Sequence, residues 1–291
     1  MGRCKAQVLM WLGRWVAGLS APARARLAWV LLRLPLLNNR RRKIARINLA
    51  LCFPQWDANA RGTLLTRTLQ SNAVGALETL RAWFATPQQL AGSAVIEGLA
   101  HLQDALAEGR GVVVVGAHYD GIELAMRHVA DAIAQPMPIL VRRHNDPAIE
   151  AVVTQARERY AGHTFDKKDI AGFAAQVRAG KAVFYVPDQN AARRTVFVPF
   201  MGVQTATLGA IGGVLQRCGG RVLLLWARRD AAGVQHIQLQ PAWPDWPNSD
   251  DSVTAARYMA WIEQRLQAAP EQYLWVHRRF KTRPPGDAPV Y

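Results

Sequence analysis

The sequence predicts an α/β protein in which a mixed, largely parallel sheet is flanked by helices and preceded by a basic amphipathic helical segment. Three observations favour this fold. Apolar runs of strand length alternate with helical stretches from about residue 93 onward. The run 111–117 contains four consecutive valines between glycines, which is typical of a central strand covered on both faces. Positive charge is concentrated at the N-terminal end.

Residues 1–56 contain eleven of the 36 Lys and Arg residues and no Asp or Glu. The remaining 235 residues therefore carry a net charge of only +4, against +15 for the whole chain of 291 residues. Nucleic-acid binding needs a positive stripe across the folded surface, so this distribution argues against it.

The same segment is apolar as well as basic. Trp11 and Trp15 belong to one helical run, and Leu27, Val30 and Leu34 lie on one face of a second. No stretch reaches 18 uncharged apolar residues, so the sequence predicts that residues 1–46 lie in the interface of an anionic membrane rather than spanning it. A cleaved signal peptide and an ordinary packed hairpin are the alternatives.

After this segment the pattern predicts one domain over residues 47–291. A long helix is expected over 57–85 because leucines recur on one face. Strands are then expected at 94–97, 111–116, 137–142, 182–187, 196–199, 221–228 and 234–240. Helices are expected at 99–108, 121–134, 147–160, 168–179, 205–218 and 252–268.

The most informative polar pair is His118 and Glu123, which follow the valine run. Chemistry in open α/β sheets takes place beyond the carboxyl ends of the strands, where a histidine can act as a general base. Five residues of regular helix would place the side chains about 140° apart. They can therefore meet only if His118 lies in the turn and Glu123 in the first helical turns. A surface histidine and a solvated glutamate are the alternative.

Three further loops follow predicted strands. Arg142 precedes a helix that Pro147 can open, which suits an anion site, although a solvated basic turn would look the same. Asp188, Arg193 and Arg194 share a second loop and reach the cleft of His118 only if their strands are neighbours. The loop 198–203 is apolar and either walls an acyl pocket or packs in the core.

Several enzyme classes lack their expected signatures. The chain has no GxSxG elbow, P-loop, HExxH or GxGxxG motif. Its three cysteines have no metal-like spacing, so neither a metal site nor a disulfide framework is expected. A base and a carboxylate without their own nucleophile suit activation of a substrate hydroxyl.

These segments together resemble the late acyltransferases of lipid A biosynthesis, the lauroyl/myristoyl acyltransferase family. The family's hallmark is a histidine followed five residues later by Asp or Glu. Residues 46–54 resemble its RxNLxLCFP stretch, Arg142 with Pro147 its RPxxNP loop, and residues 187–200 its PDQDxxRRxxVFVPFFG segment. Residues 270–281 resemble its C-terminal signature. The chain departs from these patterns at Arg143, Asp146, Asn190 and Met201.

The resemblance implies a glycerolipid acyltransferase-like fold and transfer of a fatty acyl group from acyl carrier protein to a hydroxyl of an acylated glucosamine disaccharide. It implies no cofactor beyond the pantetheine of the carrier, and a location at the cytoplasmic face of the inner membrane. The donor chain length and the hydroxyl that is acylated stay open. Another lipid acceptor, such as ornithine lipid or a phosphatidylinositol mannoside, is an alternative, as is a non-catalytic lipid-binding protein.

Within this reaction each candidate residue has an expected role. His118 is the general base and Glu123 orients its imidazole. Arg142 and the backbone N–H groups of the helix near Gly121 would stabilise the oxyanion. Arg193 and Arg194 would bind phosphate of the lipid or pantetheine, and Asp188 would support His118 or an arginine.

Overall fold

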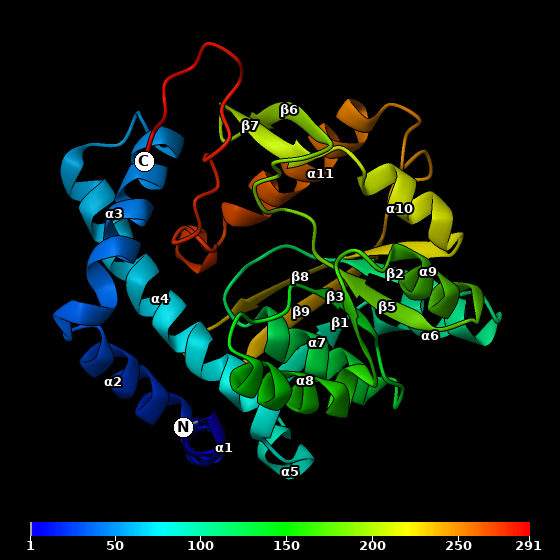
Figure 1. The fold of residues 1–291 in the computed structure, drawn as a ribbon, viewed down its shortest axis with the longest axis horizontal. Coiled ribbons are helices and arrows are strands. Elements are labelled where there is room, and N and C mark those ends of the chain that lie inside the picture. Colours follow the sequence, from blue (N-terminus) through cyan, green and yellow to red (C-terminus); the bar gives the residue numbers. More distant parts are fainter. Residues whose placement is uncertain (1) are drawn as a thin grey trace.

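The computed structural model describes residues 2–291, apart from the side chains of residues 2–5 and 35–38. Its centre is a seven-stranded sheet with the order β1-β9-β8-β2-β5-β3-β4 (Figure 1). The strands are β1 (Ala94–Glu97), β2 (Val112–Val115), β3 (Ile139–Val141), β4 (Thr164–Asp166), β5 (Ala182–Tyr185), β8 (Arg221–Arg229) and β9 (Gln235–Pro241). Neighbouring strands are parallel except for β8 and β9. The predicted mixed, largely parallel sheet is therefore confirmed.

Helices cover both faces of the sheet, which explains why β2 and β5 are buried along their whole length. In Figure 1, α7 and α8 lie on one side of the sheet and α10 and α11 on the other. The helices between and after the strands are α6 (Leu99–Ala107), α7 (Ile122–Ala132), α8 (Pro147–Ala161), α9 (Ile170–Arg178), α10 (Ile211–Cys218) and α11 (Asp251–Leu266). Asp146 and Asp250 cap α8 and α11 through their carboxylates.

One predicted helix is partly wrong. Residues 205–208, expected to begin the helix at 205–218, belong to strand β7 (Val203–Leu208) instead. This strand pairs antiparallel with β6 (Thr195–Phe200), and Met201 and Gly202 turn the chain with positive φ angles. β-branched residues such as Thr205 and Thr207 favour the extended backbone, and the helix α10 starts only after Gly209. Three short elements had no prediction, namely α5 (Pro87–Leu90), β4 and the 3₁₀ helix η1 (Pro270–Gln272).

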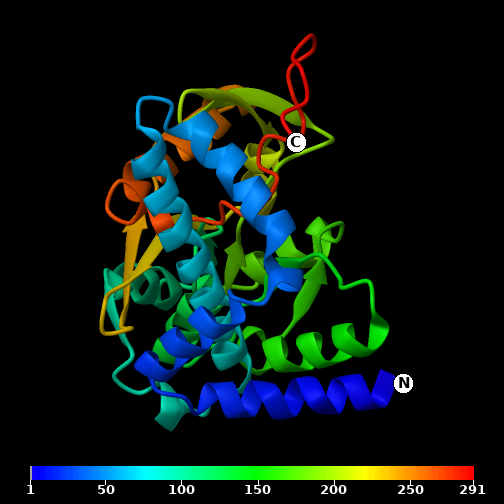
Figure 2. The ribbon, with the colours of Figure 1, turned by 90° about the vertical axis from the view of Figure 1, so that its left-hand side faces the viewer.

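The N-terminal helices pack on the body of the protein through one long helix. The N-terminal helices are α1 (Gly2–Ala17), α2 (Ala21–Leu31) and α3 (Pro35–Cys52), and the long helix is α4 (Ala58–Phe84). All three shorter helices contact α4, and α1 also runs along α8 (Figure 2). Val16 of α1 and Ala28 of α2 share a small apolar cluster with Val74 and Leu77 of α4. The predicted domain boundary after residue 46 lies inside α3.

The outer faces of α1 and α2 keep large apolar side chains in solvent. The exposed fraction is 67% for Trp11, 48% for Trp15 and 49% for Trp29. Among the residues that the structure describes, no helix is both long and apolar enough to cross a bilayer. Membrane association of residues 1–46 stays a prediction.

The direction of the strands decides where the polar loops meet. β8, β2, β5 and β3 are parallel neighbours, so the residues that follow them lie along one edge of the sheet. His118 follows β2, Asp188 follows β5 and Arg142 follows β3. From the sequence, Asp188 could reach His118 only if their strands were neighbours. The structure meets this condition, because β5 pairs with β2.

Candidate active site

His118 and Asp188 form a hydrogen-bonded dyad at this edge. The imidazole Nδ1 of His118 contacts Asp188 Oδ1, and the backbone N–H of His118 donates to Asp188 Oδ2 over 2.9 Å. The carboxylate is almost completely buried, whereas 29% of the His118 side chain is exposed. Asp188 thus holds the histidine from the inside while the ring stays open to the surface.

The charge of Asp188 is stabilised by this contact. Burial by itself raises the pKa of the carboxyl group, but the charge interaction and hydrogen bonds with His118 hold the pKa below its ordinary value. A carboxylate at Nδ1 fixes the tautomer in which Nδ1 carries the proton and Nε2 carries a lone pair. His118 is therefore arranged to accept a proton at Nε2.

A small hollow lies beside this ring. It is lined by His118, Asp188, Gln189, Tyr273, Leu274, His277 and Arg279. Burial and the nearby His118 lower the pKa of His277 to about 4, and its Nε2 accepts a hydrogen bond from the backbone N–H of Asn190 over 3.4 Å. His277 is thus neutral near pH 7 and adds no charge that would compete with His118.

Glu123 does not contact His118 in the structure, so the expected orienting role of Glu123 is wrong. It lies in the first turn of α7, as anticipated, but its side chain points toward α4 and α8. Its carboxylate accepts a hydrogen bond from Trp83 Nε1 over 3.1 Å and one from Arg157 Nε over 2.9 Å, and it also binds the hydroxyl of Tyr160. Trp83, Arg157 and Tyr160 thus occupy the carboxylate of Glu123 in the interior. The imidazole of His118 is bound by the buried Asp188 instead.

The pKa of Glu123 reflects its buried ion pair. Burial raises the pKa, but the charge of Arg157 and the hydrogen bonds outweigh burial, so the pKa lies below its ordinary value. Both oxygens are occupied, and the guanidinium of Arg157 is mostly buried with them. Glu123 therefore fastens α7 to α4 and α8.

The turn that carries His118 is paired with the segment after η1. Leu274 donates its backbone N–H to the carbonyl of His118 over 3.1 Å, and Asp120 donates its own to the carbonyl of Gln272 over 2.7 Å. Between them, Tyr119 and Tyr273 form an isolated antiparallel bridge. The position of His118 thus depends on residues about 155 positions later in the chain.

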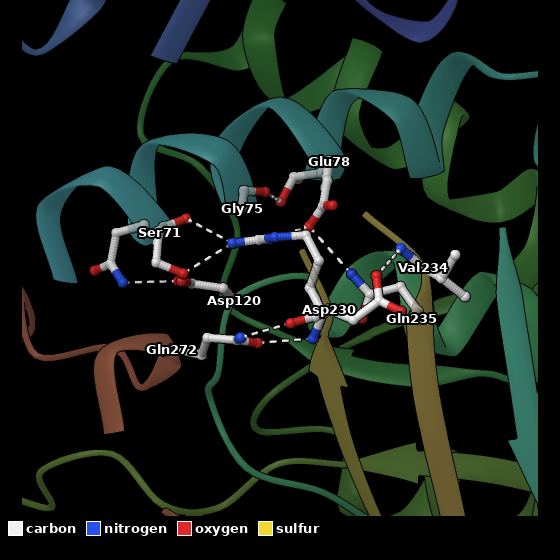
Figure 3. Close-up of polar contacts among 11 residues, drawn as sticks. Ser71, Gly75, Glu78, Asp120, Asp230, Val234, Gln235 and Gln272 are labelled. Carbon is white, nitrogen blue, oxygen red and sulfur yellow. Dashed lines mark hydrogen bonds and ion pairs between the residues drawn. The ribbon is translucent and has the colours of Figure 1, made fainter. Parts of the chain in front are cut away.

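Polar side chains from α4 and β8 hold the other side of this turn. Figure 3 shows Ser71, Glu78, Asp120 and Gln272 converging there. The guanidinium of Arg229, at the end of β8, donates to Glu78 Oε2 over 2.6 Å and to Ser71 Oγ over 2.8 Å. The backbone of Arg229 exchanges two hydrogen bonds of 2.8 Å with the amide of Gln272. This cluster links α4, β8 and the segment that pairs with His118.

Gly75 is required by the close approach of α4 to the turn. A Cβ atom on Gly75 would lie 2.9 Å from the Cβ of Asp120, which is closer than packed atoms tolerate. Asn72, one turn earlier, donates to Asp120 Oδ1 over 2.7 Å and to the carbonyl of Tyr273 over 3.2 Å. α4 therefore touches both strands of the short bridge beneath the dyad.

The three candidate arginines are exposed. Arg142 lies on the loop after β3, and Arg193 and Arg194 lie on the loop before β6. Within the described residues their side chains make no hydrogen bond or ion pair, in contrast to Arg143, whose guanidinium lies 3.6 Å from Glu150. They stay candidates for binding an anion at the carboxyl edge of the sheet.

The two described free cysteines, Cys52 and Cys218, are poor nucleophiles. Burial raises the pKa of the Cys218 thiol to about 11 and that of Cys52 still further. Among residues with described side chains, no group of three or more His, Cys, Asp or Glu could hold a metal ion.

Sequence reasoning missed the part of the site that comes from residues 272–279. Tyr273 donates its hydroxyl to Asp188 Oδ2 over 3.1 Å, and His277 and Arg279 line the hollow. The cluster of Gln272, Tyr273, Trp275, His277 and two arginines in a short non-helical stretch was a signal, since polar and aromatic residues in loops often form sites.

Comparison with known proteins identifies the family of the chain. Residues 8–282 match the family described as bacterial lipid A biosynthesis acyltransferase. The chain is 35% identical over 288 residues to the lipid A biosynthesis lauroyltransferase of Escherichia coli (strain K12), covering 96% of this chain and 93% of the relative. It is also 35% identical over 256 residues to the palmitoleoyltransferase of that strain, covering 87% and 82%.

A third relative is more distant. The lipid A biosynthesis myristoyltransferase of Escherichia coli (strain K12) is 28% identical over 259 residues, covering 86% of this chain and 78% of the relative. The family match spans nearly the whole chain, including the turn of His118, the loop of Asp188 and the segment of Tyr273. The protein therefore belongs to the bacterial lipid A biosynthesis acyltransferases.

Proposed function

We propose that the protein transfers a fatty acyl group from acyl carrier protein to a hydroxyl of a lipid A precursor, with His118 as the general base. The observation that carries the proposal is the buried contact of Asp188 with His118 Nδ1, which leaves Nε2 to accept a proton beside the hollow. Membership of the lipid A acyltransferase family supports the acceptor class.

The reaction follows from this geometry. As the lipid hydroxyl oxygen bonds to the thioester carbonyl carbon, Nε2 of His118 takes the hydroxyl proton. Asp188 stabilises the imidazolium that results. When the tetrahedral intermediate collapses, the carbon–sulfur bond breaks and the imidazolium returns its proton to the leaving sulfur. The products are an ester and the free thiol of the carrier, and the histidine is neutral again.

The exposed arginines suit the anionic parts of the substrates. Arg142 and the N–H groups at the start of α7 are the proposed donors for the oxyanion, and Arg193 and Arg194 the proposed ligands of a phosphate. Two observations support these roles. Arg142 follows β3, which lies two strands from β2, so it is at the same edge of the sheet as His118. The guanidinium groups of all three arginines are exposed and unpaired within the described residues.

The acyl donor is proposed to be an acidic carrier protein, whose pantetheine arm brings the only cofactor. Exposed basic residues of α3 offer a surface of opposite charge, namely Arg40, Arg41, Arg42, Lys43 and Arg46. Asn48 of the same helix donates to the carbonyls of Trp275 (2.6 Å) and His277 (2.7 Å), so this helix borders the segment that lines the hollow.

Product analysis tests the proposal directly. Purified protein is incubated with acyl carrier proteins bearing different chains and with lipid acceptors, including a lipid A precursor, ornithine lipid and phosphatidylinositol mannoside. We expect the lipid A precursor alone to gain the mass of one acyl group. Product only with another acceptor, or with no acceptor at all, would refute the proposed reaction. The named acyl groups of the three relatives differ, so the donor series also identifies the preferred chain.

The site of action is proposed to be the cytoplasmic face of the inner membrane, with α1 and α2 lying in the interface. The exposed tryptophans lie on helices that are already packed on α4, and Arg33 stacks over Trp29 with its guanidinium carbon 3.1 Å from the ring centre. Tryptophan and arginine on one surface are typical of helices that bind the headgroup region of anionic lipid.

Replacing Trp11 and Trp15 by serine is expected to weaken binding to vesicles of anionic phospholipid about tenfold to a hundredfold, because each ring loses apolar contact with the bilayer. Vesicle co-sedimentation measures the change. Val253→Ser, at an equally exposed apolar side chain on α11, serves as the control and should bind as the wild type does. Unchanged binding of the tryptophan variant would contradict the proposed membrane surface.

A further inference from the structure

Tyr273 is buried directly behind the dyad. It is 3% exposed, follows the short helix η1 and packs against Trp275 and Phe200, with ring centres 5.0 and 5.6 Å away. Its hydroxyl donates to Asp188 Oδ2 over 3.1 Å. Burial raises the pKa of Tyr273 well above its ordinary value, so the hydroxyl keeps its proton and stays a donor.

This hydroxyl completes the set of donors around Asp188. Oδ2 accepts from the backbone N–H of His118 and from Tyr273, while Oδ1 is left to the imidazole. Without Tyr273, the carboxylate would be held only by His118 itself. A carboxylate that is fixed by a third group can hold the imidazole in one orientation.

The backbone of Tyr273 is fixed to the same turn. Its carbonyl accepts from Asn72 Nδ2 over 3.2 Å, and the following residue, Leu274, donates to the carbonyl of His118. The hydroxyl of Tyr273 thus contacts Asp188, and the backbone of the next residue contacts His118. A residue with a purely structural role in packing would need no hydroxyl here, because phenylalanine has the same shape.

We propose that Tyr273 is a positioning residue for acyl transfer, which acts through Asp188 to set the orientation and proton affinity of His118. The inference rests on the proposed general-base role of His118. Tyr273 takes no proton from the substrate. Its hydroxyl partly neutralises the charge of the Asp188 carboxylate, which would otherwise attract the imidazolium more strongly.

The other polar groups near the dyad are bonded to other residues and do not bind Asp188 directly. Arg279 and the hydroxyl-bearing Tyr258 lie near Asp188, and His277 lies near His118. The guanidinium of Arg279 is bonded to the carbonyl of Ala206 over 2.7 Å and to Thr207 Oγ1 over 2.8 Å, and the hydroxyl of Tyr258 is bonded to the carbonyl of Gly116. Tyr273 and His118 therefore provide the direct hydrogen bonds to Asp188 in the described part of the chain.

Tyr273→Phe is expected to lower kcat about tenfold to a hundredfold, the effect of one hydrogen bond to a charged group. It should also move the acidic limb of the pH–rate profile to higher pH, by about half a unit to one unit. The sign follows because an uncompensated Asp188 attracts the imidazolium more strongly, so the histidine keeps its proton to higher pH. A merely structural defect would lower the rate equally at every pH.

Tyr119→Phe is the matched control. Tyr119 is a buried neighbour of His118 whose hydroxyl has no hydrogen-bond partner among the described residues, so its loss should change neither kcat nor the pH profile. A double-mutant cycle makes the test sharper. In an Asp188→Asn background Tyr273→Phe should have little further effect, because its route to His118 is already removed.

Wild-type kcat and pH profile for Tyr273→Phe would overturn the inference, as would a full additional loss in the Asp188→Asn background. Melting temperatures show whether each variant is folded. Failure of this inference differs from failure of the proposed function. If His118→Ala keeps wild-type activity, the general-base reaction is wrong, whereas an inactive His118→Ala beside a fully active Tyr273→Phe refutes only the role of Tyr273.

Discussion

His118→Ala and Asp188→Asn are each expected to lower the rate of acyl transfer by about 10²–10⁴-fold, the usual contribution of a general base. His118→Ala removes the proton acceptor. Asp188→Asn keeps the shape of the site but removes the charge that stabilises the imidazolium, and its amide can present N–H to the ring and favour the wrong tautomer. Initial rates with an acyl carrier protein donor measure both effects.

The two substitutions act on one unit, so their effects should not add. The double variant is expected to be about as slow as the slower single variant. His163→Ala is a suitable control because His163 is exposed and precedes β4, at the opposite edge of the sheet from the dyad, so its loss should leave the fold and the dyad intact. An Asp188→Asn enzyme that transfers acyl groups at the wild-type rate would exclude the dyad as the catalytic centre.

Glu123→Gln is expected to lower the free energy of unfolding by about 3–5 kcal/mol, because it leaves the guanidinium of Arg157 mostly buried without its counter-charge. Denaturant titration measures the change. The double variant Glu123→Gln/Arg157→Met should recover much of the loss, since no uncompensated charge then remains. Comparable stability of wild type and Glu123→Gln would show that the ion pair contributes little.

The difference in the free energy of unfolding between wild type and Glu123→Gln depends on pH with a definite sign. The pKa of Glu123 in the folded protein is lowered from an ordinary value of 4.5. The ion pair therefore contributes its full stability above about pH 4.5, and the contribution is lost as pH falls through the lower pKa of the folded state. The folded Glu123→Gln enzyme should keep far more activity than Asp188→Asn, because Glu123 does not contact the dyad.

Local patterns identified the strands and helices well. The valine run predicted β2, leucine periodicity predicted α4, and the polar turn predicted the place of His118 beyond the carboxyl end of a strand. These features depend on local backbone preferences and on which faces are buried, and both can be recognised from a few neighbouring residues. The strand at 203–208 was missed because Ala206 and Leu208 can extend the apolar pattern of the helix that follows.

The partner of His118 depended on strand order, which no local pattern contains. Glu123 is close in sequence, but its direction on α7 carries it to Trp83 and Arg157. Asp188 is 70 residues away and meets His118 only because β5 lies beside β2. The role of Tyr273 likewise requires the return of the chain end to the centre of the sheet.

The helix α4 connects two regions that experiments would treat as separate. Its 27 residues span about 40 Å, with Val74 and Leu77 beneath the N-terminal helices and with Asn72, Gly75 and Glu78 beneath the turn of His118. Removing residues 2–31 to obtain a water-soluble enzyme would therefore uncover an apolar stripe on α4. Such a truncated chain should self-associate, and its lower activity would come from a loosened support of the dyad as much as from lost contact with lipid.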